Sequence, residues 1–236
     1  MHKEELVIGS NDIDRYYNLK ISSIYTYFQE AAMHAVRDIG ADSSDLAKKN
    51  IDWVIMRMDV EIIRLPKFHD KVTTVTYPGD DMAMLYPRYY ELLDENNNIL
   101  VKGSSIWGLL DNNTRSLSFK RDLVAKQTPE HTEEELKLPE KINMPADLEK
   151  VDTRKIYYSD IDLNGHLNNC AYIRLLVDLH DSEFYKTKTP KFIRVNYLRE
   201  LKEGNVVTIY SKQENNVEHV KVMLNNDDSF YAEIIY

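Results

Sequence analysis

The chain of 236 residues carries a formal net charge of −9, is 43% hydrophobic and contains one cysteine. This composition suits one large or two small domains with an apolar core, without a disulfide framework or a cysteine-based zinc site. The acidic charge argues against general nucleic-acid binding. No segment approaches the ~18–20 apolar residues of a membrane span and the first residues lack a signal-peptide core, so we expect a soluble cytoplasmic protein.

The first half of the chain predicts one helix followed by four strands. Residues 22–40 begin with small polar residues that suit a helix N-cap. Strand-like runs rich in β-branched and aromatic residues follow at 52–64, 70–78, 84–94 and 99–111. In the first run, strict alternation predicts that Val54, Met56, Met58 and Val60 share the face turned toward the helix, where Ala32, Met33 and Val36 lie.

A charged segment with three prolines separates the two halves. It lacks clean periodicity, as a surface connector does. We therefore place one domain at residues 1–120, a connector at 121–150 and a second domain at 151–236.

The second half repeats the pattern of the first. A short strand-like run at 154–159 precedes a helix-like segment at 168–186, and strand-like runs follow at 191–200, 205–212, 218–224 and 229–236. The stretch beginning at Val60, VEIIRLPKFHDKVTTVTY, aligns with VNYLRELKEGNVVTIYSK, which begins at Val195. Each half is thus a helix wrapped by an antiparallel sheet, and the two sheets can pair edge to edge. The expected fold is α+β, a double hotdog of two tandem repeats.

Residues 157–169, YYSDIDLNGHLNN, resemble the opening of a calcium loop, with Asp160, Asp162 and Asn164 at alternate positions before Gly165. The twelfth position, which needs a bidentate glutamate, is Ala171. We therefore predict no metal site here, and we interpret Asp160 as a structural turn cap.

Four collinear segments resemble one family. SDIDLNGHLNNCAYI is similar to the catalytic stretch of the fatty acyl-acyl carrier protein thioesterases of plant plastids and bacteria, and YFQEAAMHAV, NIDWVIMRMDV and SSIWGLLDNNTRSLSFKRD resemble that family's first half. The resemblance implies a double hotdog that hydrolyses the thioester between a fatty acid and its carrier, without a cofactor. It implies the catalytic residues Asp162, Asn164, His166 and Glu200. Leu201 stands where many plant members carry a cysteine, which argues against a thiol mechanism.

These residue types suit thioester hydrolysis. A base must activate water, and hydrogen-bond donors must meet the charge that develops on the carbonyl oxygen. Histidine exchanges a proton readily near neutral pH, so His166 suits the first task, shared with Glu200. Asp162 could hold a partner and Asn164 could donate its amide, while the first amides of the helix, near Asn168 and Asn169, offer further donors. The division of roles stays open.

Structural interpretations of the same residues are also open. Asn164 and Gly165 suit an ordinary turn, and Asp162 an ordinary turn acid. Glu200 could be a solvated residue at a strand end, sharing a face with Arg194 and Asn196 if the strand alternates. Cys170 is interpreted as a small helix residue.

The alignment of the two halves sets DRYYNLKISS opposite DLNGHLNN, with no histidine in the first copy, which predicts one site per chain. We expect the first half to hold the acyl tail through Met33, Met56 and Met58, although such residues, like Trp53, equally suit the core.

The expected partner is an acyl carrier protein that docks on a basic patch, with Lys120, Arg121 and Lys126 as candidates, and a homodimer is left open. An acyl-coenzyme A thioesterase and a non-catalytic acyl-binding protein are the alternatives, and chain length and saturation are not determined.

Overall fold

The computed structural model describes residues 1–80, 82–118, 128–133 and 135–236. The first half contains β1 (His2–Val7), α1 (Ile21–Asp38), α2 (Ser43–Ala47), β2 (Ile51–Ile62), β3 (Lys71–Pro78), β4 (Leu85–Asp94), β5 (Ile99–Asp111) and β6 (Ser116–Leu117). The second half contains β7 (Glu149–Lys155), α3 (Asn169–Val177), α4 (Ser182–Thr187), β8 (Phe192–Tyr197), β9 (Val206–Glu214), β10 (Val217–Leu224) and β11 (Asp227–Ile235). Short 3-10 turns precede α1 and α3, at Ser10–Asp12 and Tyr158–Asp160.

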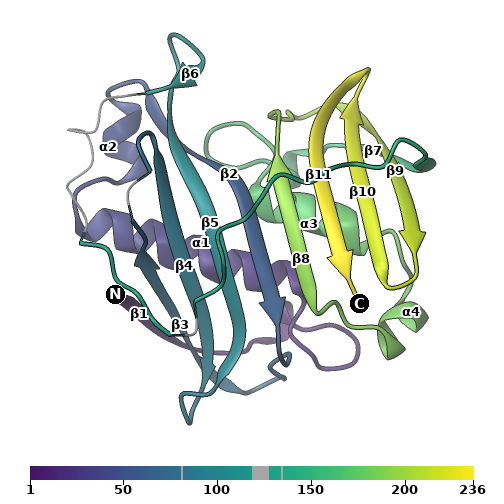
Figure 1. Cartoon of the computed structure of the whole chain (residues 1–236), viewed down its shortest axis with the longest axis horizontal. Coiled ribbons are helices and arrows are strands. Elements are labelled where there is room, and N and C mark those ends of the chain that lie inside the picture. Colours follow the sequence, from purple (N-terminus) through teal and green to yellow (C-terminus); the bar gives the residue numbers. More distant parts are fainter. Residues whose placement is uncertain (81, 119–127, 134) are drawn as a thin grey trace.

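Within the described residues, all eleven strands form one antiparallel sheet, and α1 and α3 lie side by side on one of its faces (Figure 1). The order is β1-β3-β4-β5-β2-β8-β11-β10-β9-β7, with β6 paired to the end of β5. This order confirms the repeat, because β7, α3, β8, β9, β10 and β11 take the places of β1, α1, β2, β3, β4 and β5. None of the described helices is both long and apolar enough to cross a membrane.

The two half-sheets join where β2 pairs with β8, with Met58 opposite Val195 and Val60 opposite Ile193. On the face away from the helices, Arg194 donates to both carboxylate oxygens of the buried Asp59, from Nε over 3.0 Å to Oδ1 and from a terminal nitrogen over 2.8 Å to Oδ2. Burial raises the pKa of Asp59, and Arg194 opposes that rise. A paired carboxylate thus holds the two halves together at the centre of the sheet.

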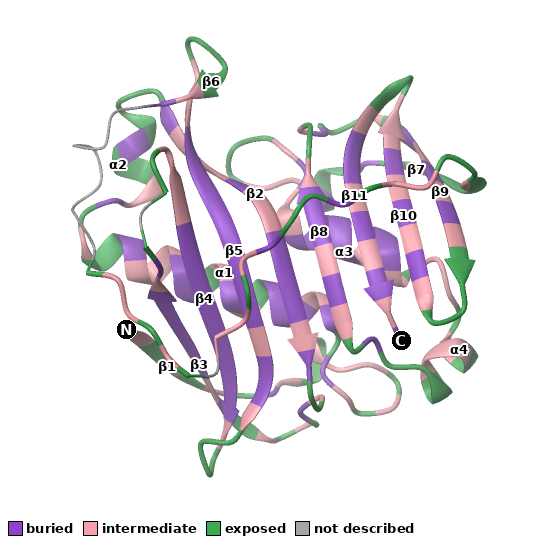
Figure 2. Ribbon diagram, viewed as in Figure 1, coloured by how far each residue is buried: buried purple, intermediate pink, exposed green. Residues whose placement is uncertain are grey.

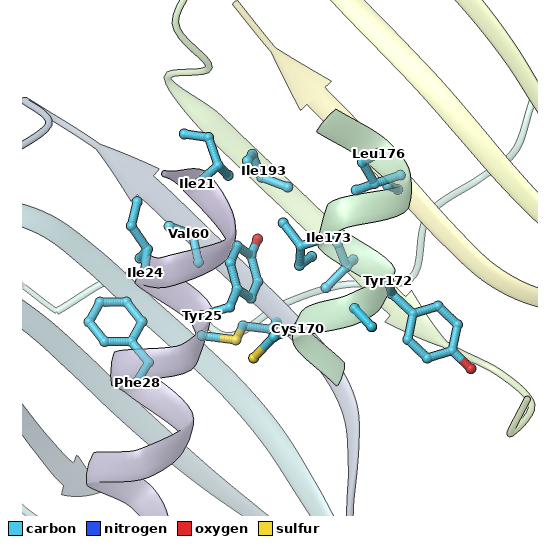
Figure 3. Close-up of a cluster of buried hydrophobic side chains, with 14 of the residues drawn as sticks. Ile21, Ile24, Tyr25, Phe28, Val60, Cys170, Tyr172, Ile173, Leu176 and Ile193 are labelled. Atoms are coloured by element: carbon cyan, nitrogen blue, oxygen red, sulfur yellow. The ribbon is translucent and has the colours of Figure 1, made fainter. Parts of the chain in front are cut away.

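The main core lies between the two long helices and the sheet. On α1, Ile21, Ile24, Tyr25 and Phe28 are buried at helical spacing, and they meet Ile173 and other residues of α3 (Figure 3). Phe28 also stacks on Tyr90 of β4, with ring centroids 4.9 Å apart. The helices therefore pack against each other as well as against the sheet, which fixes the start of α3 next to the middle of α1.

The connector does not run free on the surface. Ser104 donates to the carbonyl of Lys137 over 2.6 Å, and Asn196 of β8 accepts from the amide of Ile142 over 2.9 Å. The described connector residues therefore cross the sheet face opposite the helices, over both halves (Figure 1). This second cover explains why β4 and β5 are buried over long stretches, whereas β10 alternates (Figure 2). Lys120, Arg121 and Lys126 lie outside the described residues, and the domain boundaries stay a prediction.

Some predicted elements were wrong. The single helix expected over 168–186 is two helices, because α3 ends at Val177 and Asp181 caps the start of α4 by accepting from the amide of Phe184 over 2.9 Å. The run at 154–159 belongs to a strand that begins at Glu149 and ends at Lys155. Strand β8 ends at Tyr197, so Glu200 lies in the loop beyond it and not on a strand face with Arg194 and Asn196.

Candidate active site

The turn before α3 is held by one carboxylate. Asp162 Oδ1 accepts hydrogen bonds from the backbone amides of Asn164, over 2.9 Å, and His166, over 3.1 Å, and the Asp162 amide donates to the His166 carbonyl over 2.8 Å. Gly165 has φ +77°, a left-handed conformation that glycine adopts at low cost. The sequence DLNGH therefore forms a closed turn that fixes the backbone of His166.

The first half contains the same turn without the imidazole. Asp14 Oδ1 accepts from the amides of Tyr16, over 2.8 Å, and Asn18, over 3.0 Å. Bridges between Ile13 and Leu19, and between Ile161 and Leu167, close the two turns alike. The predicted alignment of the two segments is thus confirmed, and Asn18 occupies the place of His166. Because Asp14 shapes a turn that lacks the histidine, Asp162 has a structural task that the fold itself demands.

A loop after β8 brings Glu200 to His166. The Leu167 amide donates to the Leu201 carbonyl over 2.7 Å, which ties this loop to the turn. His166 Nε2 then lies 3.2 Å from Glu200 Oε2, with side chains that are 21% and 29% exposed. In the first half the matching bond runs from the Leu19 amide to the Pro66 carbonyl, over 2.8 Å, so Leu65 stands where Glu200 does. The imidazole–carboxylate pair therefore belongs to the second copy.

Arg115 joins this pair from the other half of the chain. It lies in the turn between β5 and β6, and its guanidinium contacts Glu200 Oε2, the oxygen that also faces His166. Sequence reasoning missed Arg115, because no local motif marks it. The available signal was its position within SSIWGLLDNNTRSLSFKRD, one of the segments that carry the family resemblance.

The remaining polar residues have separate partners. Asp160 accepts from the Tyr157 amide over 3.1 Å and from Arg174 over 3.3 Å, which confirms it as a turn cap. Asn164 is exposed, and its side chain has no hydrogen-bond partner in the described part of the chain. The structure therefore joins Asp162, His166 and Glu200 in one network and leaves the side-chain amide of Asn164 exposed.

At the start of α3, most backbone N–H groups of the first turn already have hydrogen-bond partners. Asn168 Oδ1 accepts from the Cys170 amide and the Asn168 carbonyl accepts from the Ala171 amide, both over 2.8 Å. In the described residues this leaves the Asn169 amide as the unpartnered N–H of the first turn. Burial raises the pKa of the Cys170 thiol to about 11, so this thiol is neutral at physiological pH.

A small cavity lies where the two halves meet. Its volume is about 10 Å³, enough for about one water. Tyr25 lines it, is 2% exposed, and has a hydroxyl with no partner among the described residues. Figure 3 shows Tyr25 on α1 next to Cys170 on α3. The full lining is Tyr25, Gln29, Ile55, Met58, Tyr90, Trp107, Asn169, Cys170 and Tyr197.

The predicted alternation of β2 was wrong at Val54 and Met56, whereas Met58 and Val60 are buried in the core beside the helices as predicted. The pairing of β2 with β5 shifts between Ile55 and Arg57, so Met56 is the extra residue of a β-bulge. Ile55 and Met58 consequently both line the cavity on the helix side. Met56 lies near Gly108, which pairs with Val54, on the opposite face. Met33 contacts Ser43 through its sulfur, over 3.7 Å, and neither Met33 nor Met56 lines the cavity.

Comparisons with known proteins match nearly the whole chain. Family models for the acyl-ACP thioesterase N-terminal and C-terminal domains match residues 1–126 and 145–235. An oleoyl-acyl carrier protein thioesterase of Arabidopsis thaliana is 24% identical, covering 97% of this chain and 67% of the relative. A palmitoyl-acyl carrier protein thioesterase of Cuphea hookeriana is 25% identical, covering 87% of this chain and 53% of the relative. The chain thus spans about half to two thirds of the curated relatives it matches.

Solved structures show the same fold. An acyl-ACP thioesterase of Bacteroides thetaiotaomicron superposes with a TM-score of 0.85 at 22% identity, covering 99% of this chain and 96% of that one. A 12:0-ACP thioesterase of Umbellularia californica gives 0.82 at 18% identity, covering 99% and 95%. Two tandem helix-and-sheet units, with the imidazole–carboxylate pair of His166 and Glu200 beside the turn of the second unit, define a double-hotdog protein. With both domain models matched, the chain belongs to the acyl-ACP thioesterase family.

Proposed function

We propose that this protein hydrolyses the thioester of fatty acyl-acyl carrier protein and releases a free fatty acid. The observation that carries the proposal is the 3.2 Å approach of His166 Nε2 to Glu200 Oε2 at the one turn of the repeat that contains an imidazole. Membership of the family and the acyl carrier substrates named for its curated relatives support the same reaction.

The geometry suggests how water attacks the thioester. Glu200 and His166 together accept a proton from a water molecule, whose oxygen adds to the thioester carbonyl carbon. Asp162 fixes the backbone of His166, and the Asn169 amide and the side chain of Asn164 are the available donors to the developing oxyanion. When the carbon–sulfur bond breaks, the imidazolium returns the proton to the leaving thiolate. The products are a carboxylic acid and the carrier thiol.

We further propose that the acyl tail enters between the halves, at the cavity beside α1. Six of its lining residues come from the first half, and Asn169, at the start of α3, also lines it. The cavity holds about one water, so a tail requires neighbouring side chains to move. Met58 is suited to this because its unbranched side chain adapts its shape. Met33 and Met56 stay predictions as tail contacts.

Turnover on matched carriers tests the proposal. Free fatty acid release is measured with one acyl chain on acyl carrier protein and on coenzyme A. A higher kcat/KM for the carrier protein supports the proposal, whereas preference for coenzyme A supports an acyl-coenzyme A thioesterase. Binding without turnover on either carrier would indicate a non-catalytic acyl-binding protein. A cytoplasmic location, a homodimer and electrostatic docking of the carrier also stay predictions.

A further inference from the structure

A second cluster of polar side chains lies far along α1 from the candidate active site, where β1 meets the last turns of the helix. The inward-facing residues of β1 are His2, Glu4 and Leu6, which are partly buried, while their neighbours in sequence are exposed. Leu6 contacts the core, as an inward residue of an edge strand normally does. His2 and Glu4 instead meet His34 and Asp38, which are one helical turn apart on α1.

The contacts in this cluster converge on one point. His2 Nε2 lies 2.7 Å and His34 Nδ1 lies 2.5 Å from the same oxygen, Glu4 Oε1. Each of the three residues offers one ligand atom, and these three atoms all lie within 4.8 Å of one another. Around a tetrahedral zinc ion with bonds of ~2.0–2.1 Å, ligand atoms lie about 3.3 Å apart, so small side-chain shifts suffice to seat an ion.

A fourth residue completes the arrangement. His2 Nδ1 lies 3.2 Å from Asp38 Oδ2, so the ring nitrogen that does not face Glu4 has a carboxylate partner. Histidines that bind metals in proteins usually donate their second N–H in this way, which fixes the ring's tautomer and orientation.

We propose that His2, Glu4 and His34 bind one divalent cation of the zinc class, with Asp38 orienting His2. Two imidazole nitrogens and one carboxylate oxygen are ligands that suit zinc, and water fills the fourth position. Without a cation, both imidazoles hydrogen-bond to the same carboxylate oxygen of Glu4. The cation joins β1, at the end of the sheet where it pairs with β3, to the helix that carries Tyr25 and Gln29. The inference does not depend on the proposed thioesterase activity.

Calorimetric titration of the untagged protein with zinc chloride tests this site. The expected result is one ion per chain with a Kd on the order of 1 μM or tighter. H34A and E4Q are each expected to weaken binding at least about ten-fold, and D38N about 10–100-fold, the range for loss of a residue that orients a metal ligand. H219A is the matched control, because His219 pairs with Glu233 over 3.1 Å on the sheet, away from this cluster.

A second measurement keeps the test independent of the variants' folding. Zinc should raise the Tm of the wild-type protein and of H219A by similar amounts, and should raise that of H34A by less at the same zinc concentration. D38N alters a side chain that is 58% exposed, so it is expected to fold as the wild type does. Absence of stoichiometric zinc binding to the wild type, or equal affinity in the wild type, E4Q and H34A, would overturn the proposal and leave a histidine–carboxylate clamp without a metal.

Discussion

The side-chain amide of Asn169 donates to Gln29 Oε1 over 3.1 Å, which joins the first residue of α3 to the middle of α1. Both residues line the cavity between the halves. The Asn169 carbonyl also accepts from the hydroxyl of Tyr197, over 3.3 Å. Asn169, whose backbone N–H has no partner among the described residues, is therefore held in place by Gln29 of the first half and Tyr197 of the second.

Q29A should lower kcat/KM about two- to ten-fold, because losing one hydrogen bond is worth about 0.5–1.5 kcal/mol and would release the side chain of Asn169. Steady-state hydrolysis of acyl carrier protein thioesters checks this, with Q213A, an exposed glutamine, as the control. Equal kcat/KM in Q29A and the wild type, with both proteins folded, would show that the bond between the helices has no role in turnover.

R115Q should lower kcat about ten-fold or more with KM little changed, since Arg115 contacts the same oxygen of Glu200 that faces His166 and so sets its orientation. R154Q removes another arginine–carboxylate contact, with Asp178 on the surface, and should leave kcat unchanged. If R115Q raised KM alone, Arg115 would serve substrate binding instead.

C170A should retain wild-type kcat, because the thiol is buried and neutral. Its pKa of about 11 lies above the ~8.5 of a free thiol, so the reactive thiolate forms only at high pH. Alkylation of the folded protein by iodoacetamide should therefore stay slow at pH 8 and accelerate toward pH 11. Fast alkylation at pH 8, accompanied by loss of activity, would restore a thiol mechanism.

M58A should shift preference toward longer acyl chains, because it enlarges the cavity that we propose as the entrance for the tail. Each buried methylene is worth about 0.8 kcal/mol, so room for two more carbons corresponds to about 1.6 kcal/mol, or roughly fifteen-fold in kcat/KM. M223A, on β10, is the matched control. A uniform fall at every chain length would place the limit on length elsewhere.

Much of the fold was predictable because the repeat and the strand pattern are local. Strand β5 occupies 99–111 as predicted, and the alignment of DRYYNLK with DLNGHLN holds bond for bond in the two turns. The β1 strand was missed because its inward face is polar at His2 and Glu4, which hides the alternation that marks a half-buried strand.

Other features depend on contacts between distant segments. Because of the bulge at Met56, Val54 and Met56 face away from the helices while Met58 and Val60 stay on the helix side, and alternation alone gives no sign of it. Arg115 meets Glu200 across 85 positions of the chain. The sequence likewise carried no signal that joins His34 to β1, since the two ligating elements are separated by 30 positions.

Release of free fatty acid from acyl carrier protein by the wild type and H166A, with folding checked by circular dichroism, tests the central claim most directly. The wild type should turn over, and H166A should lose a factor on the order of 10²–10⁴ in kcat, the usual contribution of a positioned acid or base. Wild-type kcat in H166A would remove the imidazole–carboxylate pair from the mechanism and contradict the account.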